Sequence, residues 1–225
     1  MARRRLLSFL FLLLCVAAFA GFVALGVWQV QRLAWKEDLI ARVDARVHAA
    51  PVTAPAPGDW ASVSKDVHEY RRVQLTGEYR VDGLSLVAAA TEEGQGYWVM
   101  VPLQRADGSR VYINRGFVPQ RLREQAARGD FTPRGQVSVT GLLRLNQPGG
   151  GVLRDNVPTE NRWYSRDVLA MAEQHGLAPV APYFVDAEAS AQPGPIGGLT
   201  VIRFPNNHRV YAITWFALAL GVMLA

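Results

Sequence analysis

The two ends of the sequence constrain the fold most strongly, because each carries a long stretch without a charged residue. At the C-terminal end, the 16 residues from Val210 to Ala225 are all uncharged. The bilayer interior offers no partner for a free backbone N–H or C=O group, so such a segment can cross it only as a helix. A helix of this length spans about 24 Å, slightly less than the ~30 Å hydrocarbon core. We therefore predict a membrane helix over residues 208–225, with a buried core helix as the alternative.

The N-terminal end has the same character. Three arginines, Arg3–Arg5, precede the 23 uncharged residues from Leu6 to Trp28, which are enough to span a bilayer with some tilt. A cleaved signal peptide is the alternative, because Ala18-Phe19-Ala20 resembles a cleavage site. Signal peptides, however, have apolar regions of only about 7–15 residues. We predict that residues 1–5 are a basic cytoplasmic terminus and that residues 6–28 form a membrane helix.

Two spans place both ends of the chain on the same side of the membrane. Because Arg3–Arg5 favour a cytoplasmic N-terminus, we predict a multi-pass protein with both termini in the cytoplasm and the middle of the chain outside. Residues 29–50 are predicted to extend the first helix, since Trp35, Leu39, Val43 and Val47 recur at every fourth position. The remaining residues, 51–207, are numerous enough for one domain with its own core.

This external domain is predicted to be β-rich. Asp107-Gly108 lies between two alternating segments and predicts the tight turn of a hairpin. The prolines of Pro51–Gly58 predict a linker, because proline disfavours both helix and strand. Strands that follow one another through short turns favour an antiparallel sheet, with a barrel as its closed form. The fold class is thus an α+β domain between two terminal membrane helices, with strands predicted at 70–79, 84–90, 97–103, 110–118, 136–144 and 182–185 and helices at 121–128 and 166–175.

Composition and motifs exclude several classes of protein. The single cysteine, Cys15, lies in the first apolar stretch, so the predicted domain has no disulfide, thiol nucleophile or cysteine metal site. The formal net charge is +5, but the basic residues are scattered beyond Arg3–Arg5, which argues against a nucleic-acid partner. We find no metalloprotease, serine-hydrolase, phosphate-loop or dinucleotide-binding motif. We therefore predict that the protein is not an enzyme.

His208 is the candidate ligand that the sequence offers. It lies at the predicted membrane boundary, one helical turn before Tyr211 and two before Trp215, so the three share a helix face. A neutral imidazole there can ligate a haem iron while the aromatic side chains pack on the macrocycle. The alternative is that all three are interfacial anchors. His175, by contrast, precedes Gly176 at a predicted helix end, where an imidazolium would interact favourably with the helix dipole.

Seven short segments carry a resemblance to a known family. In chain order they are Gly26–Lys36, Tyr70–Val73 with Gly77, Gly96–Val99 ahead of Pro102-Leu103, Val111–Pro119, Gly141–Arg144, Trp163-Tyr164, and Asn206–His208 through Thr214-Trp215. Each is weak alone, but together they span nearly the whole chain. In this order they resemble the surfeit locus protein 1 family of cytochrome c oxidase assembly factors.

The resemblance implies a non-enzymatic helper in the inner membrane of a bacterium, with its central domain in the periplasm. It implies binding of haem a and help with its insertion, with the oxidase catalytic subunit, the haem a synthesis machinery and membrane lipid as partners. His208 matches the family's ligand candidate for the haem iron, and Tyr211 and Trp215 would be contacts. Arg115 would either pair with a protein carboxylate or bind a haem propionate, since guanidinium binds carboxylate bidentately. A scaffold that docks oxidase subunits without a cofactor is the alternative.

Overall fold

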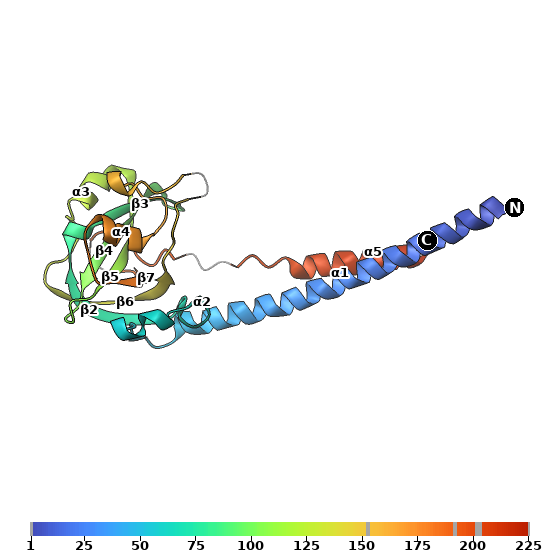
Figure 1. The fold of residues 1–225 in the computed structure, drawn as a ribbon, viewed down its shortest axis with the longest axis horizontal. Helices are drawn as coiled ribbons and strands as arrows, with labels where there is room; N and C mark the ends of the chain where they lie inside the picture. The colour runs from blue at the N-terminus through green and yellow to red at the C-terminus, as the bar shows by residue number, and fades with distance from the viewer. Residues whose placement is uncertain (1, 152–153, 191–192, 201–203, 225) are drawn as a thin grey trace. The chain divides into compact units, whose positions relative to one another are not determined.

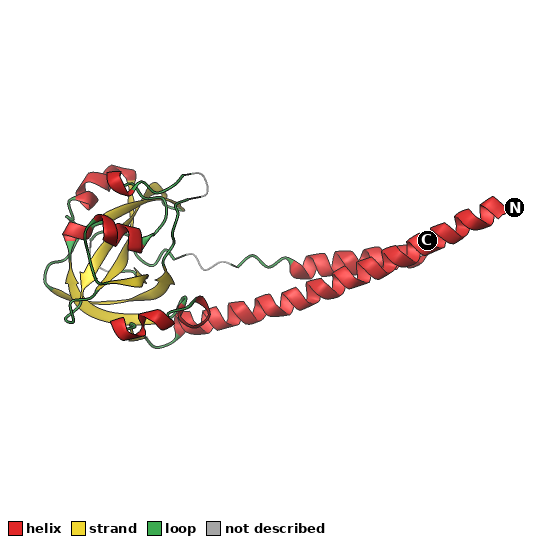
Figure 2. Cartoon of the chain, in the orientation of Figure 1, coloured by secondary structure: helices red, strands yellow, loops and turns green. Residues whose placement is uncertain are grey.

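The chain forms two compact units, one comprising Met1–Asp44 and Ile202–Ala225 and the other Ala45–Val201. We describe them from a computed structural model that covers residues 2–151, 154–190, 193–200 and 204–224. The first unit consists of helices, and the strands all belong to the second (Figure 1, Figure 2).

The first unit contains most of one long apolar helix and the whole of a shorter one. Helix α1 runs without a break over Ala2–His48, 47 residues, and helix α5 over His208–Leu224, 17 residues. Within the described part of the chain, α1 alone is long and apolar enough to cross a membrane, with a mean hydropathy of 2.7 in its most apolar window. The N-terminal apolar helix therefore indicates a membrane anchor. Helix α5 is apolar too, but shorter.

Helix α5 packs against α1 through small and aromatic residues. The rings of Phe22 and Trp215 stack with centroids 5.7 Å apart. Ala212 and Ala219 are buried on α5, and a Cβ atom added to Gly26 of α1 would lie 2.6 Å from the Phe216 ring. Small residues let two helices approach closely, which is the usual basis of helix association in lipid.

The second unit is a small mixed β-barrel. Strands β2, β6, β7, β5 and β4 follow one another around the barrel, and a β2–β4 pairing closes it, while β1 and β3 add to its edges (Figure 1). The strands are β1 Val52–Thr53, β2 Arg72–Tyr79, β3 Ser85–Thr91, β4 Gly94–Gln104, β5 Arg110–Pro119, β6 Gln136–Leu145 and β7 Val180–Ala187. The short helices are α2 Lys65–His68, α3 Arg123–Ala127 and α4 Val168–Gln174, and single 3₁₀ turns lie at Pro57–Ser62, Val81–Gly83, Gln120–Leu122 and Pro158–Glu160.

The prediction of an antiparallel sheet is wrong in one respect. Strand β7 lies between β5 and β6, antiparallel to β6 and parallel to β5, and β1 is parallel to β2. The sequence argument assumed that strands adjacent in the chain are adjacent in the sheet. The long connection through α4 instead brings β7 back between two earlier strands, and a long crossover permits parallel pairing. The barrel form of the sheet is confirmed.

The predicted hairpin is also confirmed. Strands β4 and β5 pair antiparallel across the Arg105–Ser109 turn. In that turn the Asp107 carboxylate accepts a hydrogen bond of 2.9 Å from the Ser109 backbone N–H. Gly108 has a φ of +79°, a conformation that costs glycine little.

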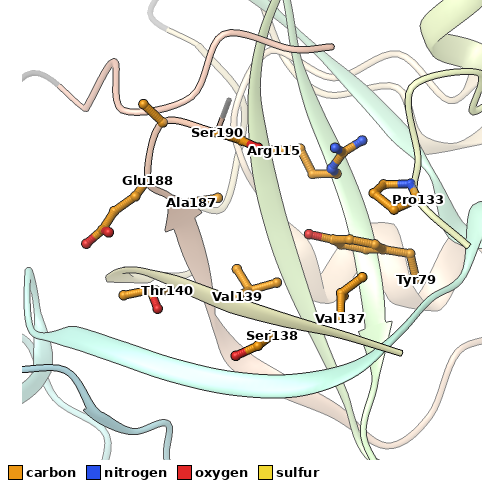
Figure 3. A pocket seen from close by; sticks show the side chains of 11 residues that line it. Tyr79, Arg115, Pro133, Val137, Ser138, Val139, Thr140, Ala187, Glu188 and Ser190 are labelled. Carbon is orange, nitrogen blue, oxygen red and sulfur yellow. The ribbon is translucent and has the colours of Figure 1, made fainter. Parts of the chain in front are cut away.

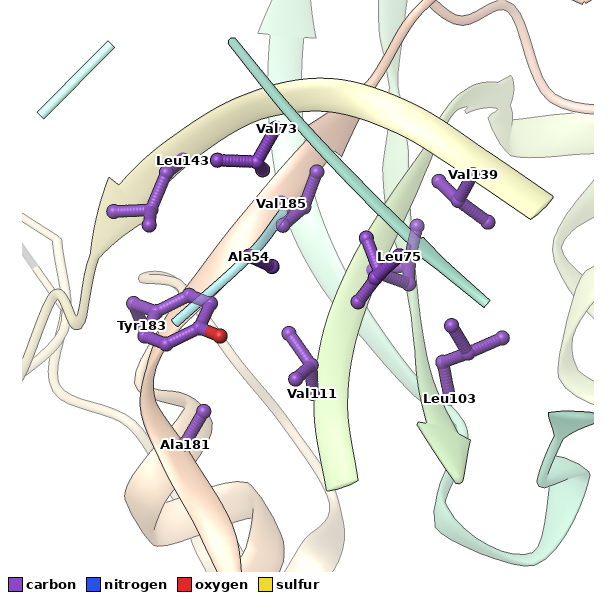
Figure 4. Packing of buried hydrophobic residues seen from close by; sticks show 11 residues of the cluster. Ala54, Val73, Leu75, Leu103, Val111, Val139, Leu143, Ala181, Tyr183 and Val185 are labelled. Atoms are coloured by element: carbon purple, nitrogen blue, oxygen red, sulfur yellow. The ribbon is translucent and has the colours of Figure 1, made fainter. Parts of the chain in front are cut away.

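Alternation along the strands divides the core between the barrel and its outer face. On β5, Val111 and Ile113 point into the barrel, whereas Tyr112 packs outside it in the cluster that includes Met171 of α4. Figure 4 shows the barrel cluster, which comprises Ala54, Val73, Leu75, Leu103, Val111, Ile113, Val139, Leu143, Ala181, Tyr183 and Val185.

The proline-rich segment is not the linker that we predicted. It contributes strand β1, and Ala54 is buried in the barrel core. The Pro55 carbonyl accepts hydrogen bonds from Trp60 Nε1, Arg105 and the Tyr183 hydroxyl at 3.3, 3.0 and 2.8 Å. Proline is tolerated here because β1 is an edge strand of two residues.

Candidate functional site

The helix that carries His208 begins where the sequence changes from polar to apolar. Helix α5 starts at His208, and the Asn207 carbonyl accepts the backbone N–H of Tyr211 at 3.2 Å. Asn207 is thus the N-terminal cap, a position that favours asparagine. The cap fixes His208 in the first turn of the helix.

Gln29 of α1 holds the His208 imidazole. The His208 Nδ1 atom lies 2.7 Å from Gln29 Oε1. An amide oxygen only accepts, so Nδ1 carries the proton, and in the neutral ring the lone pair is then on Nε2. Gln29 is a polar residue in a largely apolar stretch of α1, and only 8% of its surface is exposed. Of the two neutral tautomers, the glutamine therefore favours the one that is protonated at Nδ1.

The aromatic residues predicted to accompany His208 differ in their surroundings. Trp215 stacks on Phe22 of α1 and is half-buried. Tyr211 has 54% of its surface exposed. His208 and Trp215 thus both contact α1, while Tyr211, one helical turn after His208, leaves its ring accessible.

Arg115 belongs to the barrel unit. It lies on β5, donates a hydrogen bond to the Phe131 carbonyl, and places its guanidinium 5.2 Å from the centre of the Tyr79 ring. Burial lowers the pKa of Arg115, an effect that Tyr79 partly opposes. Among the described residues no carboxylate pairs with it, so the ion pair offered as one alternative is not found.

The residues on either side of Arg115 have structural roles. Asn114 donates a hydrogen bond of 2.8 Å to Asp186 and accepts one of 3.1 Å from the Gly116 backbone. Gly116 has a φ of +125°, and a side chain there would collide with the carbonyl of Ile196, which pairs with Phe117. Both neighbours are therefore explained by local backbone geometry and buried hydrogen bonding.

A buried charge network surrounds Asp186, which is 3% exposed. Arg144 and Arg166 each lie 3.2 Å from its carboxylate, and Arg144 also binds Glu69 at 2.8 Å. Burial acts to lower the pKa of both guanidinium groups. At Arg144 the neighbouring carboxylates outweigh burial, so the pKa of Arg144 is raised. At Arg166 burial outweighs the carboxylates, so the pKa of Arg166 is lowered. Two positive and two negative groups balance one another.

The same network joins the first and last segments of the barrel unit. Arg46, near the start of the unit, donates hydrogen bonds to the backbone carbonyls of Asp66 and Glu69. Thr200, near its end, donates to Asp186 at 3.1 Å. The network therefore stabilises the region where the chain enters and leaves the barrel.

Within the described ranges, no three histidine, cysteine, aspartate or glutamate side chains are grouped so as to hold a metal ion. His175 lies at the C-terminal end of α4, as predicted. Its Nε2 lies 3.2 Å from the buried Ser85 hydroxyl, and burial lowers its pKa, which favours the neutral ring over the imidazolium that the helix dipole would stabilise. His208 is the histidine for which the structure supplies both a fixed tautomer and an apolar setting.

Comparison with known proteins decides the family. The sequence matches the SURF1 family over residues 16–220, a range that includes Gln29, Arg115 and His208. The chain belongs to the SURF1 family. Surfeit locus protein 1 of Homo sapiens is 33% identical over 237 residues, covering 95% of this chain and 74% of the human protein. The Mus musculus protein is 35% identical, covering 92% and 71%, and a SURF1-like protein of Caenorhabditis elegans is 33% identical, covering 95% and 71%.

Two features of this SURF1 family member escaped the sequence analysis. Gln29 lay inside a recognised segment but received no role, although a polar side chain in an apolar helix is a signal for function. The charge network was missed as well. Its signal was the presence of Arg144 and Asp186 within otherwise apolar strand segments, but partners from separate strands cannot be matched without the sheet order.

Proposed function

We propose that this SURF1 family member assists the assembly of cytochrome c oxidase by holding haem a, as cargo, through His208. The family is known for cytochrome c oxidase assembly factors. The observation that carries the haem proposal is the 2.7 Å contact between His208 Nδ1 and Gln29 Oε1.

The contact matters because of how histidine binds metals. A metal-ligating histidine almost always donates its other ring N–H to an acceptor, which fixes the tautomer and raises the basicity of the ligating nitrogen. Gln29 supplies that acceptor, so Nε2 is left to provide an axial nitrogen to the haem iron. The donor set therefore fits the group.

The surroundings of His208 suit an amphiphilic macrocycle. Both helices are apolar, and Tyr211 and Trp215 follow on the next turns of α5 as contacts for its flat face. A single side-chain ligand also suits a cargo that must be passed on, because fewer bonds must break at transfer. The recipient in this proposal is the catalytic subunit of the oxidase, and the donor is the haem a synthesis machinery.

The proposed site is at the outer boundary of a bacterial inner membrane. Helix α5 has 17 residues and spans about 26 Å, so pairing with α1 and modest thinning of the bilayer would let it cross. Both termini would then be cytoplasmic and the barrel periplasmic.

A second function is a scaffold that docks oxidase subunits and binds no haem. One observation favours it: a hydrogen bond between polar side chains is also a common way to join two membrane helices. The Gln29–His208 pair would then serve α1–α5 association alone.

The visible spectrum of the full chain separates the two functions. The protein is purified in detergent after co-expression with haem a synthesis, as wild type, His208→Ala, Gln29→Leu and the exposed-site controls Gln31→Leu and His48→Ala. We expect a haem band in the wild type and both controls, its loss in His208→Ala, and haem affinity about 10–100-fold weaker in Gln29→Leu, the usual effect of losing such a supporting partner.

Two results would contradict the haem proposal. A band of unchanged position and intensity in His208→Ala would assign the iron to another ligand. Colourless protein in every variant, with haem a present in the same membranes, would leave the scaffold as the function.

A further inference from the structure

A pocket opens beside Arg115 in the barrel unit. It has a volume of about 290 Å³ and lies between β6 and the segment that follows β7 (Figure 3). Val137 and Val139 of β6, Pro133 and Ala187 form an apolar part of its wall, and Ser138, Thr140 and Ser190 add polar side chains. Arg115 and Tyr79 place a guanidinium and a phenol at one side of this space.

Arg115 is the sole cation among the residues that line the pocket, and none of the described residues neutralises it. The one acidic residue in the lining, Glu188, is bound by Arg72 through two contacts of 2.6 and 3.1 Å. Figure 3 shows its carboxylate turned away from Arg115. Arg115 donates to the Phe131 carbonyl and faces the Tyr79 ring, but a guanidinium has five N–H donors. A further interaction joins Arg115 to the Tyr79 side chain, and the remaining donors are available to a ligand.

Arg115 is partly buried and has no acid partner among the described residues, so the solvation that it has lost points to an anion that binds in the pocket. We propose that the Arg115 pocket binds a carboxylate carried on a short apolar arm. The planar fork of arginine matches a carboxylate bidentately, and the valine and proline walls match two or three methylene groups.

The lining argues against a phosphate group. A phosphate dianion needs two positive groups or several backbone N–H donors, and the pocket contributes one cation. The carboxylate arm has two sources, a small free acid or the side chain of a glutamate in a partner protein. The pocket belongs to the barrel unit, so this inference stands whether or not His208 holds haem.

Chemical protection tests the pocket in the intact wild-type chain. Phenylglyoxal modifies accessible arginines, and mass spectrometry of the digested full-length protein in detergent gives a rate for each one. Butyrate is the carboxylate probe, butyramide its neutral isostere, inorganic phosphate the alternative anion, and N-acetylglutamate N-methylamide the peptide-like source. Arg134, exposed and without an ion pair among the described residues, is the control for general screening.

We expect butyrate to protect Arg115 and to leave Arg134 unchanged. Occupancy follows mass action, so butyrate at ten times its dissociation constant slows modification about elevenfold. Stronger protection by the glutamate derivative would identify a protein side chain as the source, and stronger protection by butyrate would identify a free acid.

Three outcomes would overturn the inference. They are protection by butyramide equal to that by butyrate, protection by phosphate equal to that by butyrate, and equal or absent protection at Arg115 and Arg134. A second measurement, saturation-transfer NMR on butyrate, should give a signal with the wild type that falls strongly in Arg115→Lys, which keeps the charge but loses the bidentate fork. Circular dichroism checks that the variant remains folded, and a signal unchanged in a folded variant would also refute the site.

Discussion

Polar side chains are buried in both units of this protein, but in opposite ways. In the helical unit the buried pair is neutral, Gln29 with His208, and it involves one hydrogen bond. In the barrel unit the buried polar groups include a charged network, in which Asp186 accepts hydrogen bonds from Asn114, Arg144, Arg166 and Thr200. A buried charge is costly unless it is paired, and in the barrel network each charged group has an oppositely charged partner.

The contrast separates stability from function. Every charge in the barrel network has a partner, so the network is explained by the fold that it supports. In the helical pair no described residue bonds the second ring nitrogen of His208, and α1 and α5 also pack through Gly26, Ala212 and Phe22. The helical unit therefore has the weaker polar contact, but that contact leaves a ring nitrogen of His208 for binding a ligand.

The largest expected effect comes from breaking the charged side of this comparison. Asp186→Ala leaves Arg144 and Arg166 buried with one carboxylate between them, and removing one partner of a buried ion pair costs about 3–5 kcal/mol. Unfolding of the full chain by denaturant, followed by the fluorescence of buried Trp163, measures the loss.

The matched control is Asp130→Ala. Asp130 pairs with Arg128 at 3.0 Å, but both side chains are well exposed, and such pairs contribute about 0–1 kcal/mol. Equal losses in the two variants would show that the Asp186 network does not carry the stability assigned to it.

A smaller effect is expected from the helical side. Gly26→Ile places a side chain where a Cβ atom already lies 2.6 Å from the Phe216 ring, and overpacking of this kind costs about 1–3 kcal/mol. We expect α5 to separate from α1, which changes the emission of Trp215 as it leaves Phe22, while the unfolding midpoint of the barrel stays the same.

Gly21→Ile is the control for this experiment. Gly21 lies on the same helix, and no atom lies within 4 Å of its added Cβ. If both variants alter Trp215 emission alike, close packing at Gly26 is not what holds the helices together.

A feature of the fold or of the site could be predicted from the sequence where it depends on residues that are neighbours in the chain. The apolar runs, the Asp107-Gly108 turn and the strand alternation are local signals, and the corresponding helices, hairpin and strands are present. The parallel β5–β7 pairing could not be predicted, because it depends on which strands a long connection brings together. His208 was predicted as a ligand from its place at a predicted membrane boundary, but its contact Gln29 could not be predicted, because it is 179 residues away in the sequence.

The smallest expected effect concerns the neutral histidine of the barrel, the counterpart of His208. Burial lowers the pKa of His175 in the folded chain below its ordinary value of 6.5. The unfolded chain therefore binds a proton first as the pH falls, so this contribution to stability is complete above pH 6.5 and is lost as the pH falls through the folded-state pKa. Asp82 raises the His175 pKa and so narrows the pH range over which this stability is lost.

Denaturant midpoints measured across this pH range should fall less steeply in His175→Gln than in the wild type. The steeper slope should persist in His68→Gln, which removes a histidine that is not buried. Identical slopes in all three proteins would mean that His175 titrates alike in the folded and unfolded chains, and that its burial against Ser85 does not favour the neutral ring.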